Sequence, residues 1–199
     1  PLHGRHYLQC PNLRAAYICI RKLRLQCYDH TIFPNLFICN RSIILYHGSQ
    51  EIVEYPEIRL TKYNKDFSFG FYCTNNYNQA YRWASRKDKP GIINKYSYII
   101  NPSLNICHFP EMSDKWLDFI AQCRAGIPHS YDIVEGPMAD DTIWDFVNDF
   151  LDEKISRTIF WEYAKFKHPT HQISFHTVNA LRCLTFEGSE TIYDRTRRK

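Results

Sequence analysis

Short runs of β-branched and aromatic residues recur along the chain from residue 43 onward. Runs of this kind, separated by Gly, Pro, Asn and Ser, are typical of β-strands. The pattern predicts strands over 43–46, 70–74, 93–100, 104–108, 131–135, 172–176 and 183–187.

Apolar residues at helical spacing fill several of the segments between these strands. Within 113–124 and again within 141–150 they repeat at i, i+3, i+4 and i+7 behind acidic or hydroxyl residues that suit a helix N-terminus. Further helices are expected over 13–27, 78–87 and 177–184. Because the strands and helices are mixed without a regular βαβ alternation, the pattern favours an α+β fold with antiparallel sheets.

Length and composition place the chain among ordinary globular proteins. At 199 residues it is long enough for one domain with an appended segment. No apolar run approaches the length of a membrane span, and no apolar signal core follows the N-terminal charges. The eight cysteines form no CxxC pair, which favours reduced thiols over a disulfide framework or a zinc site. We therefore expect a cytoplasmic protein with no membrane partner and no bound metal.

Charge is distributed unevenly along the chain. Residues 1–42 carry six Lys or Arg against one Asp, and residues 195–199 carry four more basic side chains. Because the net charge is only +4, the segment between them is acidic. Basic ends are compatible with nucleic-acid binding and equally with solubilising surfaces.

Several common functional motifs are absent from the sequence. There is no GxxxxGK, GxGxxG, GxSxG or HExxH. What remains is a set of three separated segments, "LYHGS" at 45–49, "FGFYCTNNYNQAYRWA" at 69–84 and "HQISFHT" at 171–177. Each segment alone is compatible with a turn or a core packing role, so their joint occurrence in this order is the informative feature.

Together these segments resemble the ADP-ribosyltransferase superfamily, in the branch shared by diphtheria-type toxins and poly(ADP-ribose) polymerases. The wider pattern is similar to a less characterised, mainly bacterial family of that superfamily, over roughly 43–187. The resemblance implies a split antiparallel β-sheet with flanking helices. It leaves a basic helical extension at 1–42 and a basic tail at 188–199 outside the domain.

The resemblance also implies roles for the first segment in binding NAD as a co-substrate. The backbone of Gly48 would hold the nicotinamide carboxamide with no side chain in the way, and Ser49 would add a hydroxyl contact. His47 would hold the adenosine-side ribose.

In the second segment the resemblance assigns aromatic contacts. Tyr72 would lie against the nicotinamide face, and an aromatic residue of the following helix would complete the sandwich. Both Tyr81 and Trp83 are available, and we prefer Trp83.

The third segment departs from the family pattern. Gln172 stands where a catalytic glutamate is expected, and glutamine makes a hydrogen bond but carries no charge. The first candidate for a replacement negative charge is Asp140, within "YDIVEGPMADD". The alternative role of Asp140 is to cap the helix that follows. Other candidates are Asp66, Asp132, Glu135 and Asp141.

Two functions follow from this resemblance. The first is an NAD-dependent mono-ADP-ribosyltransferase or NAD glycohydrolase, with a protein or a nucleic acid as the acceptor. The alternative is a catalytically silent NAD- or nucleic-acid-binding module of the same fold, because of Gln172.

Overall fold

The computed structural model describes residues 42–59, 65–85, 89–139, 141–165, 167 and 169–193, of which Asp141 and Thr142 are described for their backbone only. These residues belong to one compact unit, Asn40–Lys199. The helix expected over 13–27 and the basic residues 195–199 lie outside the described part of the chain.

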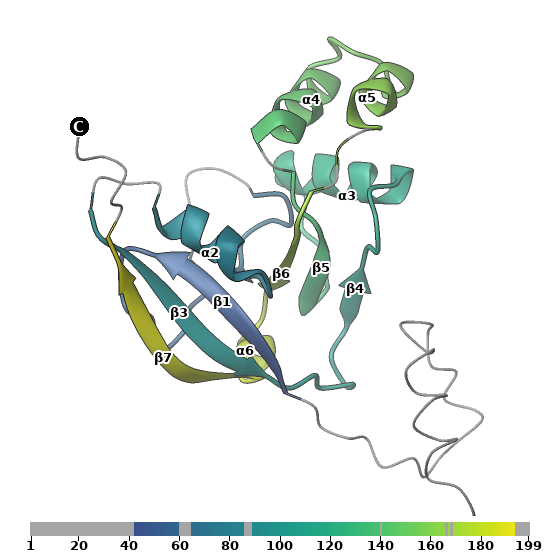
Figure 1. Ribbon diagram of the computed structural model, residues 1–199. Coiled ribbons are helices and arrows are strands. Elements are labelled where there is room, and N and C mark those ends of the chain that lie inside the picture. The colour runs from purple at the N-terminus through teal and green to yellow at the C-terminus, as the bar shows by residue number, and fades with distance from the viewer. Residues whose placement is uncertain are drawn as a thin grey trace, which may run out of the picture. The chain divides into compact units, whose positions relative to one another are not determined.

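The strands of the described residues form two sheets (Figure 1). The three-stranded sheet has the order β1-β3-β7, with β1 at Ile43–Ser49, β3 at Gly91–Tyr98 and β7 at Leu184–Ile192. The four-stranded sheet has the order β2-β6-β5-β4, with β2 at Phe71–Cys73, β6 at His171–Phe175, β5 at Ile133–Pro137 and β4 at Ile106–His108.

The prediction of mixed helices and mostly antiparallel sheets is confirmed, and every expected strand is present with shifted bounds. One pair differs from the expectation, because β4 runs parallel to β5. A helix lies between these two strands in the chain and returns it to the starting edge, which is the connection that parallel strands require.

Strand β7 is longer than the sequence pattern indicated. It continues to Ile192, so residues 188–192 belong to the sheet and not to a C-terminal tail. Gly188, which the pattern treated as the end of the strand, has φ 134° and pairs with Lys95 at a register shift between Lys95 and Tyr96. Glycine at this position accommodates a bulge inside the ladder and does not terminate it.

Five helices are present among the described residues: α2 at Tyr77–Ala84, α3 at Asp114–Arg124, α4 at Asp141–Leu151, α5 at Arg157–Ala164 and α6 at Val178–Leu181. Polar caps begin several of them. The Asn76 side chain accepts from the backbone of Asn78 and Gln79, and Ser113 accepts from Trp116 N–H. The sequence pattern missed α5, whose aromatic and β-branched residues favour strands.

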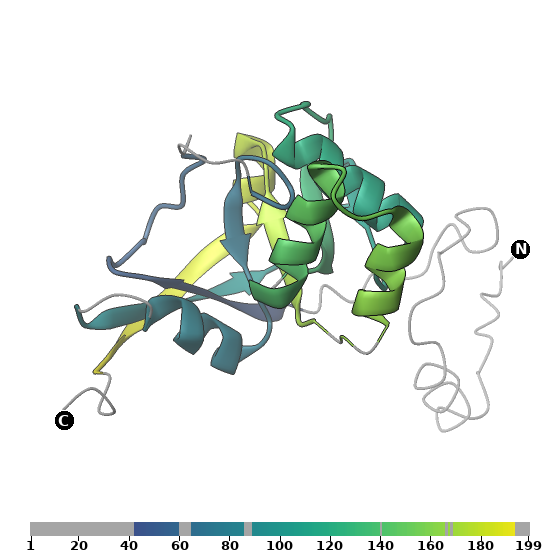
Figure 2. The same ribbon diagram turned by 90° about the horizontal axis from the view of Figure 1, so that it is seen from above.

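Two groups of buried side chains hold these layers together. One lies between the two sheets and is built around Leu45, Phe71, Tyr96 and Phe175. The other lies between the four-stranded sheet and helices α3, α4 and α5, which Figures 1 and 2 both show grouped away from α2. Helix α2 covers the opposite face of the three-stranded sheet, where Ala80 and Ala84 pack on Ile93.

We predict that the buried indole of Trp116 couples α3 to β5. Its Nε1 donates to the Pro137 carbonyl at 2.9 Å, so Trp116→Phe leaves that oxygen without a partner and lowers the free energy of unfolding by about 2–4 kcal/mol. The matched control is Trp161→Phe, which loses a bond to the exposed Asp114 and is expected to change the free energy of unfolding much less than Trp116→Phe does. Urea unfolding compares them, and equal losses contradict the coupling.

Candidate functional site

Strands β1 and β2 touch at one point and then separate. Tyr46 and Thr74 exchange backbone hydrogen bonds of 2.7 and 2.9 Å. If this antiparallel pairing continued, Gly48 would lie opposite Tyr72. Instead the Tyr72 carbonyl accepts from Nδ1 of His47 at 2.7 Å, so a side chain replaces the backbone contact. Because backbone groups alternate along a strand, the N–H and C=O of Gly48 point to the same outer edge as those of Tyr46.

A cavity of about 440 Å³ opens at this edge, and we call it the edge cavity. Five of its lining residues are those that the sequence analysis assigned to NAD: His47, Gly48, Ser49, Tyr72 and Trp83. The structure therefore brings together residues from β1, β2 and α2. The polar residues of the lining that the sequence analysis did not single out are Gln50, Glu51, Glu57, Arg59 and Lys65.

The missing side chain of Gly48 has a packing cause. A Cβ at this position would lie 2.2 Å from the Ala80 carbonyl oxygen and 2.9 Å from the Ala84 nitrogen. Helix α2 therefore lies on Gly48, and the space that the sequence analysis reserved for a ligand on that side is filled by the helix. What Gly48 offers the edge cavity is its backbone edge. A valine at position 48 would disturb the helix packing and would not simply block a ligand.

The imidazole of His47 is held in one tautomer. Because a carbonyl only accepts, Nδ1 carries the proton that it donates to Tyr72. Burial lowers the pKa of His47 to about 4; the bond to Tyr72 opposes the shift and the nearby charges of Lys65 and Arg59 assist it. The ring is thus neutral at pH 7, and its Nε2 is a hydrogen-bond acceptor at the edge cavity.

The hydroxyl of Ser49 is already used within the protein. It donates to the Glu51 carbonyl at 2.6 Å and accepts from Nδ2 of Asn94 at 3.0 Å. Asn94 also accepts from Val53 N–H at 2.8 Å, so this fully buried amide fastens the segment after β1 along the edge cavity. The sequence signal for this role is the asparagine inside the strand-like run "GIINKYSYII".

The Tyr72 ring is anchored at its hydroxyl group. This group donates to the Ser68 carbonyl at 2.6 Å and accepts from Phe67 N–H at 3.1 Å. Ser68 has φ 69°, a left-handed turn that directs its carbonyl back to the ring. The Lys65 ammonium nitrogen lies 4.5 Å from the ring centroid, which is a cation–π contact at the wall of the edge cavity.

Two histidines form hydrogen bonds to the backbone of the segment 67–69, which precedes β2. His176 donates from Nδ1 to the Phe69 carbonyl at 2.8 Å and accepts from the Ser174 hydroxyl at 2.8 Å. The ring of His129 contacts that of His176 and its Nε2 donates to the Phe67 carbonyl at 3.2 Å. Burial lowers the pKa of His176 to about 4, so this ring is also neutral at pH 7.

Of the two aromatic candidates on α2, Trp83 lines the edge cavity, whereas Tyr81 is 37% exposed and is not part of the lining. Gln50 caps the end of the same helix through a bond from Nε2 to the Ala84 carbonyl at 2.7 Å. Its Oε1 is buried and has no hydrogen-bond partner among the described residues. Gln50 therefore holds the C-terminal end of α2 next to β1 and leaves one buried acceptor unsatisfied within the described part of the chain.

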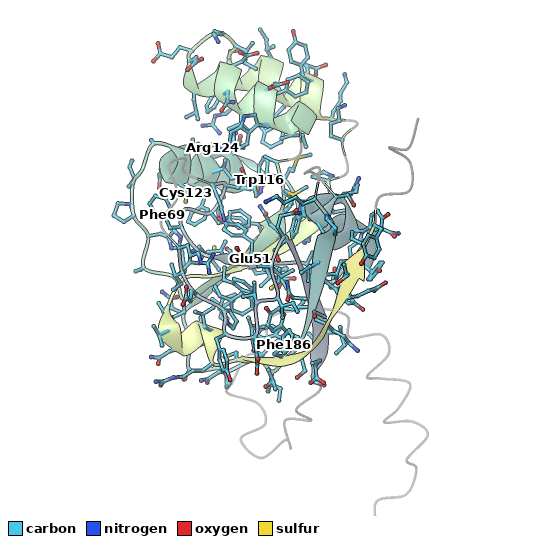
Figure 3. All side chains as sticks on the ribbon, turned by 90° about the vertical axis from the view of Figure 1, so that its left-hand side faces the viewer. Glu51, Phe69, Trp116, Cys123, Arg124 and Phe186 are labelled. Carbon is cyan, nitrogen blue, oxygen red and sulfur yellow. The ribbon has the colours of Figure 1, made fainter. Side chains whose placement is uncertain are left out.

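Gln172 does not line the edge cavity. Its side chain is 4% exposed and donates to Oδ2 of Asp66 at 3.1 Å. Asp66 also accepts from Ala139 N–H at 2.9 Å and pairs with Arg124 at 2.7 Å. Figure 3 labels Arg124 on helix α3. The expectation that Gln172 faces the bound NAD is thus not met, because its amide is needed as a donor to a buried carboxylate.

Among the described residues, none of the other candidates for a replacement negative charge lines the edge cavity. Asp140 lies outside the described residues, as does the side chain of Asp141. Asp132 accepts from Thr177 and from the Asn105 backbone, and these bonds lower its pKa. Glu135 lies 3.4 Å from His108 on the neighbouring strand. The carboxylates that do line the edge cavity are Glu51 and Glu57, which both approach Arg59.

Within the described ranges, no group of three or more His, Cys, Asp or Glu is placed to hold a metal ion. No helix in the described ranges is long and apolar enough to cross a membrane.

The site thus belongs to a mixed α/β domain in which two open sheets separate at a ligand-sized cavity. Comparison with protein families matches residues 43–186 to a family described as "Protein of unknown function (DUF3990)". The chain belongs to this family. The comparisons with curated proteins and with solved structures found no match.

We predict that Gln172→Glu is destabilising. It replaces a donor to Asp66 with a second carboxylate in the same buried space, which is expected to lower the free energy of unfolding by about 2–4 kcal/mol at pH 7. Asp66→Asn combined with Gln172→Glu restores one donor and one acceptor, so the double variant is expected to recover part of this loss. Urea unfolding measures both, and an unchanged single variant contradicts the network.

The two neutral histidines predict a loss of stability in acid. Their pKa values of about 4 lie below the value of 6.5 in the unfolded chain, so the unfolded state binds more protons between these pH values. The free energy of unfolding is expected to fall as pH drops from 6.5 towards 4, by about 3 kcal/mol for both rings together, since both keep some solvent contact. His176→Gln is expected to make this decline shallower in urea titrations, and a slope equal to that of the unsubstituted protein counts against it.

Proposed function

We propose that the protein is an NAD-consuming enzyme, a mono-ADP-ribosyltransferase or NAD glycohydrolase, that binds NAD in the edge cavity. The observation that carries the proposal is that His47, Gly48, Ser49, Tyr72 and Trp83 line one cavity although they come from three elements. These are the residues to which the resemblance to ADP-ribosyltransferases assigns the contacts with NAD, and the cavity joins the β1 residues to Tyr72 of β2 and Trp83 of α2.

The backbone of β1 suits a carboxamide. The outward N–H and C=O of Gly48 supply a donor and an acceptor, which an amide group needs in return. An amide entering here would donate to one of these groups and accept from the other.

The remaining contacts suit the sugar and the cationic ring of NAD. The neutral His47 presents Nε2 as an acceptor for a ribose hydroxyl. The Tyr72 ring already holds an ammonium ion, which shows that its face attracts positive charge. A pyridinium ring is a cation that also stacks.

Turnover additionally needs negative charge near the ribose as the nicotinamide leaves. Gln172 is buried beside Asp66 and is not available for this purpose. The proposal therefore assigns the charge to Glu51 or Glu57, which line the edge cavity. Removing one such electrostatic group lowers rates by about 10²–10³ in enzymes where it acts. The acceptor is a protein side chain or a nucleic acid.

A silent NAD-binding module is the second candidate, and the burial of Gln172 favours it. In this case the edge cavity binds NAD without cleaving it, because both carboxylates of the lining face Arg59 at the exposed rim. Nicotinamide release on mixing the protein with NAD separates the candidates. Release that is lost in Glu51→Gln or Glu57→Gln supports the enzyme, whereas binding without release supports the module.

The test of NAD binding uses two aromatic residues of the same helix. Trp83→Leu removes an aromatic wall of the edge cavity and is expected to weaken NAD binding about 3–10-fold. Tyr81→Leu is the matched control, since Tyr81 does not line the cavity, and binding is expected to stay within about twofold. Calorimetry measures both affinities. No binding by the unsubstituted protein, or equal losses in the two variants, overturns the site.

A further inference from the structure

Lys65 lies with its ammonium over the Tyr72 ring, where the nicotinamide ring of the proposed ligand would stack. Its ammonium nitrogen lies 4.5 Å from the centroid of the Tyr72 ring, and both residues line the edge cavity. The ring cannot move aside easily, because its hydroxyl is bonded to Ser68 and Phe67. The lysine is the adaptable partner, since its ammonium ends a stem with four rotatable carbons.

The Lys65 ammonium is partly stripped of water and poorly compensated. Burial lowers its pKa, which reflects the loss of hydration. Among the described residues no carboxylate is within ion-pair distance of it, and the neighbouring Asp66 is bonded to Arg124. Glu51 and Glu57 approach Arg59 instead. The contact with the Tyr72 face is therefore its main favourable interaction in the empty cavity.

Two cations cannot share one face of a ring at contact distance. A pyridinium that stacks on this face of Tyr72 must displace the ammonium, and it regains the cation–π attraction that the ammonium gives up. The displaced ammonium then needs an anion, because it is left in a partly dry cavity with no acidic partner. A diphosphate on the same ligand supplies that anion and accepts charge-assisted hydrogen bonds.

We propose that Lys65 sets the ligand selectivity of the edge cavity by exchanging its contact with the Tyr72 ring for a contact with phosphate when a ligand carries both a pyridinium and a diphosphate. This inference rests on the proposed function and adds a specificity-determining residue to it. A pyridinium without phosphates displaces Lys65 and leaves it unpaired. A diphosphate without a pyridinium draws Lys65 away and leaves the ring face empty. The oxidised dinucleotide meets both needs, and the reduced form, whose ring is neutral, does not.

The experiment compares three probes with the full chain and with Lys65→Met, which keeps the length of the side chain and removes its charge. The probes are the N-methylnicotinamide cation, ADP-ribose and NAD, with affinities from calorimetry or NMR titration. We expect Lys65→Met to bind the pyridinium probe about fivefold more tightly, because no ammonium competes for the ring. It is expected to bind ADP-ribose about 10–50-fold more weakly, because a charged contact to phosphate is lost.

Two further variants exclude a simple structural effect. Lys65→Arg keeps the charge and is expected to bind ADP-ribose within about threefold of the unsubstituted protein. Lys115→Met removes a lysine from the exposed face of α3 and is expected to leave all three affinities unchanged. The exchange is supported if Lys65→Met binds the N-methylnicotinamide cation more tightly and ADP-ribose more weakly. Both control variants must also keep affinities close to those of the unsubstituted protein.

Other outcomes overturn it in distinguishable ways. If the unsubstituted protein binds NAD but both partial ligands change in the same direction in Lys65→Met, or neither changes, the selectivity role of Lys65 is wrong and the proposed site stands. If the unsubstituted protein binds none of the three probes, the proposed function fails and the role of Lys65 fails with it.

Discussion

The close approach of helix α2 to strand β1 at Gly48 is the constraint on which the edge cavity depends. Any side chain at position 48 would overlap the backbone of the helix, so only glycine allows this distance. The approach sets Trp83 of α2 beside the outer edge of β1. It also keeps the helix on the face opposite to His47, whose ring is then free to cross to β2 and bond to Tyr72. The missing side chain of Gly48 thus allows α2 to pack on β1 beside the edge cavity.

Around the edge cavity, neutral histidines hold the backbone, and charged side chains lie at other positions in its lining or behind it. The neutral histidines His47 and His176 hold β2 and the segment before it by hydrogen bonds that do not depend on charge at pH 7. The strong ion pair, Asp66 with Arg124, is buried behind Tyr72 and fixes Gln172. The charges that line the edge cavity are those of the exposed Glu51, Glu57 and Arg59 and of the partly buried Lys65, which lies against an aromatic ring and not against a carboxylate. The walls of the edge cavity are thus held by internal hydrogen bonds, whereas the Lys65 ammonium has a ring contact in place of an ion pair with a described residue.

The sequence predicts which segments form the candidate site better than it predicts what each residue does there. The resemblance carried by "LYHGS" and "FGFYC" predicts one site for both segments, and His47, Gly48 and Tyr72 line the same cavity. The hydrogen-bond partners of the individual side chains are harder to predict from the sequence. The resemblance assigns the Ser49 hydroxyl to a ligand, and in the structure this hydroxyl also bonds to the Glu51 carbonyl and to Asn94, because hydroxyl groups readily bond to nearby backbone. Gln172 was assigned to the cavity from its motif, and only its register beside Asp66 shows why an amide is needed there.

The sequence by itself determined the positions of the strands, most of the helices and the α+β class, because periodicity and capping act over a few residues. It could not determine that β4 runs parallel to β5, that β7 continues past Gly188, or that Lys65 lies on Tyr72. These features depend on contacts between segments distant in the chain, or on bulges that tolerate a glycine inside a strand. Tertiary structure alone decided which charges are buried and which face the cavity, since burial is a property of the whole packing and not of any local pattern.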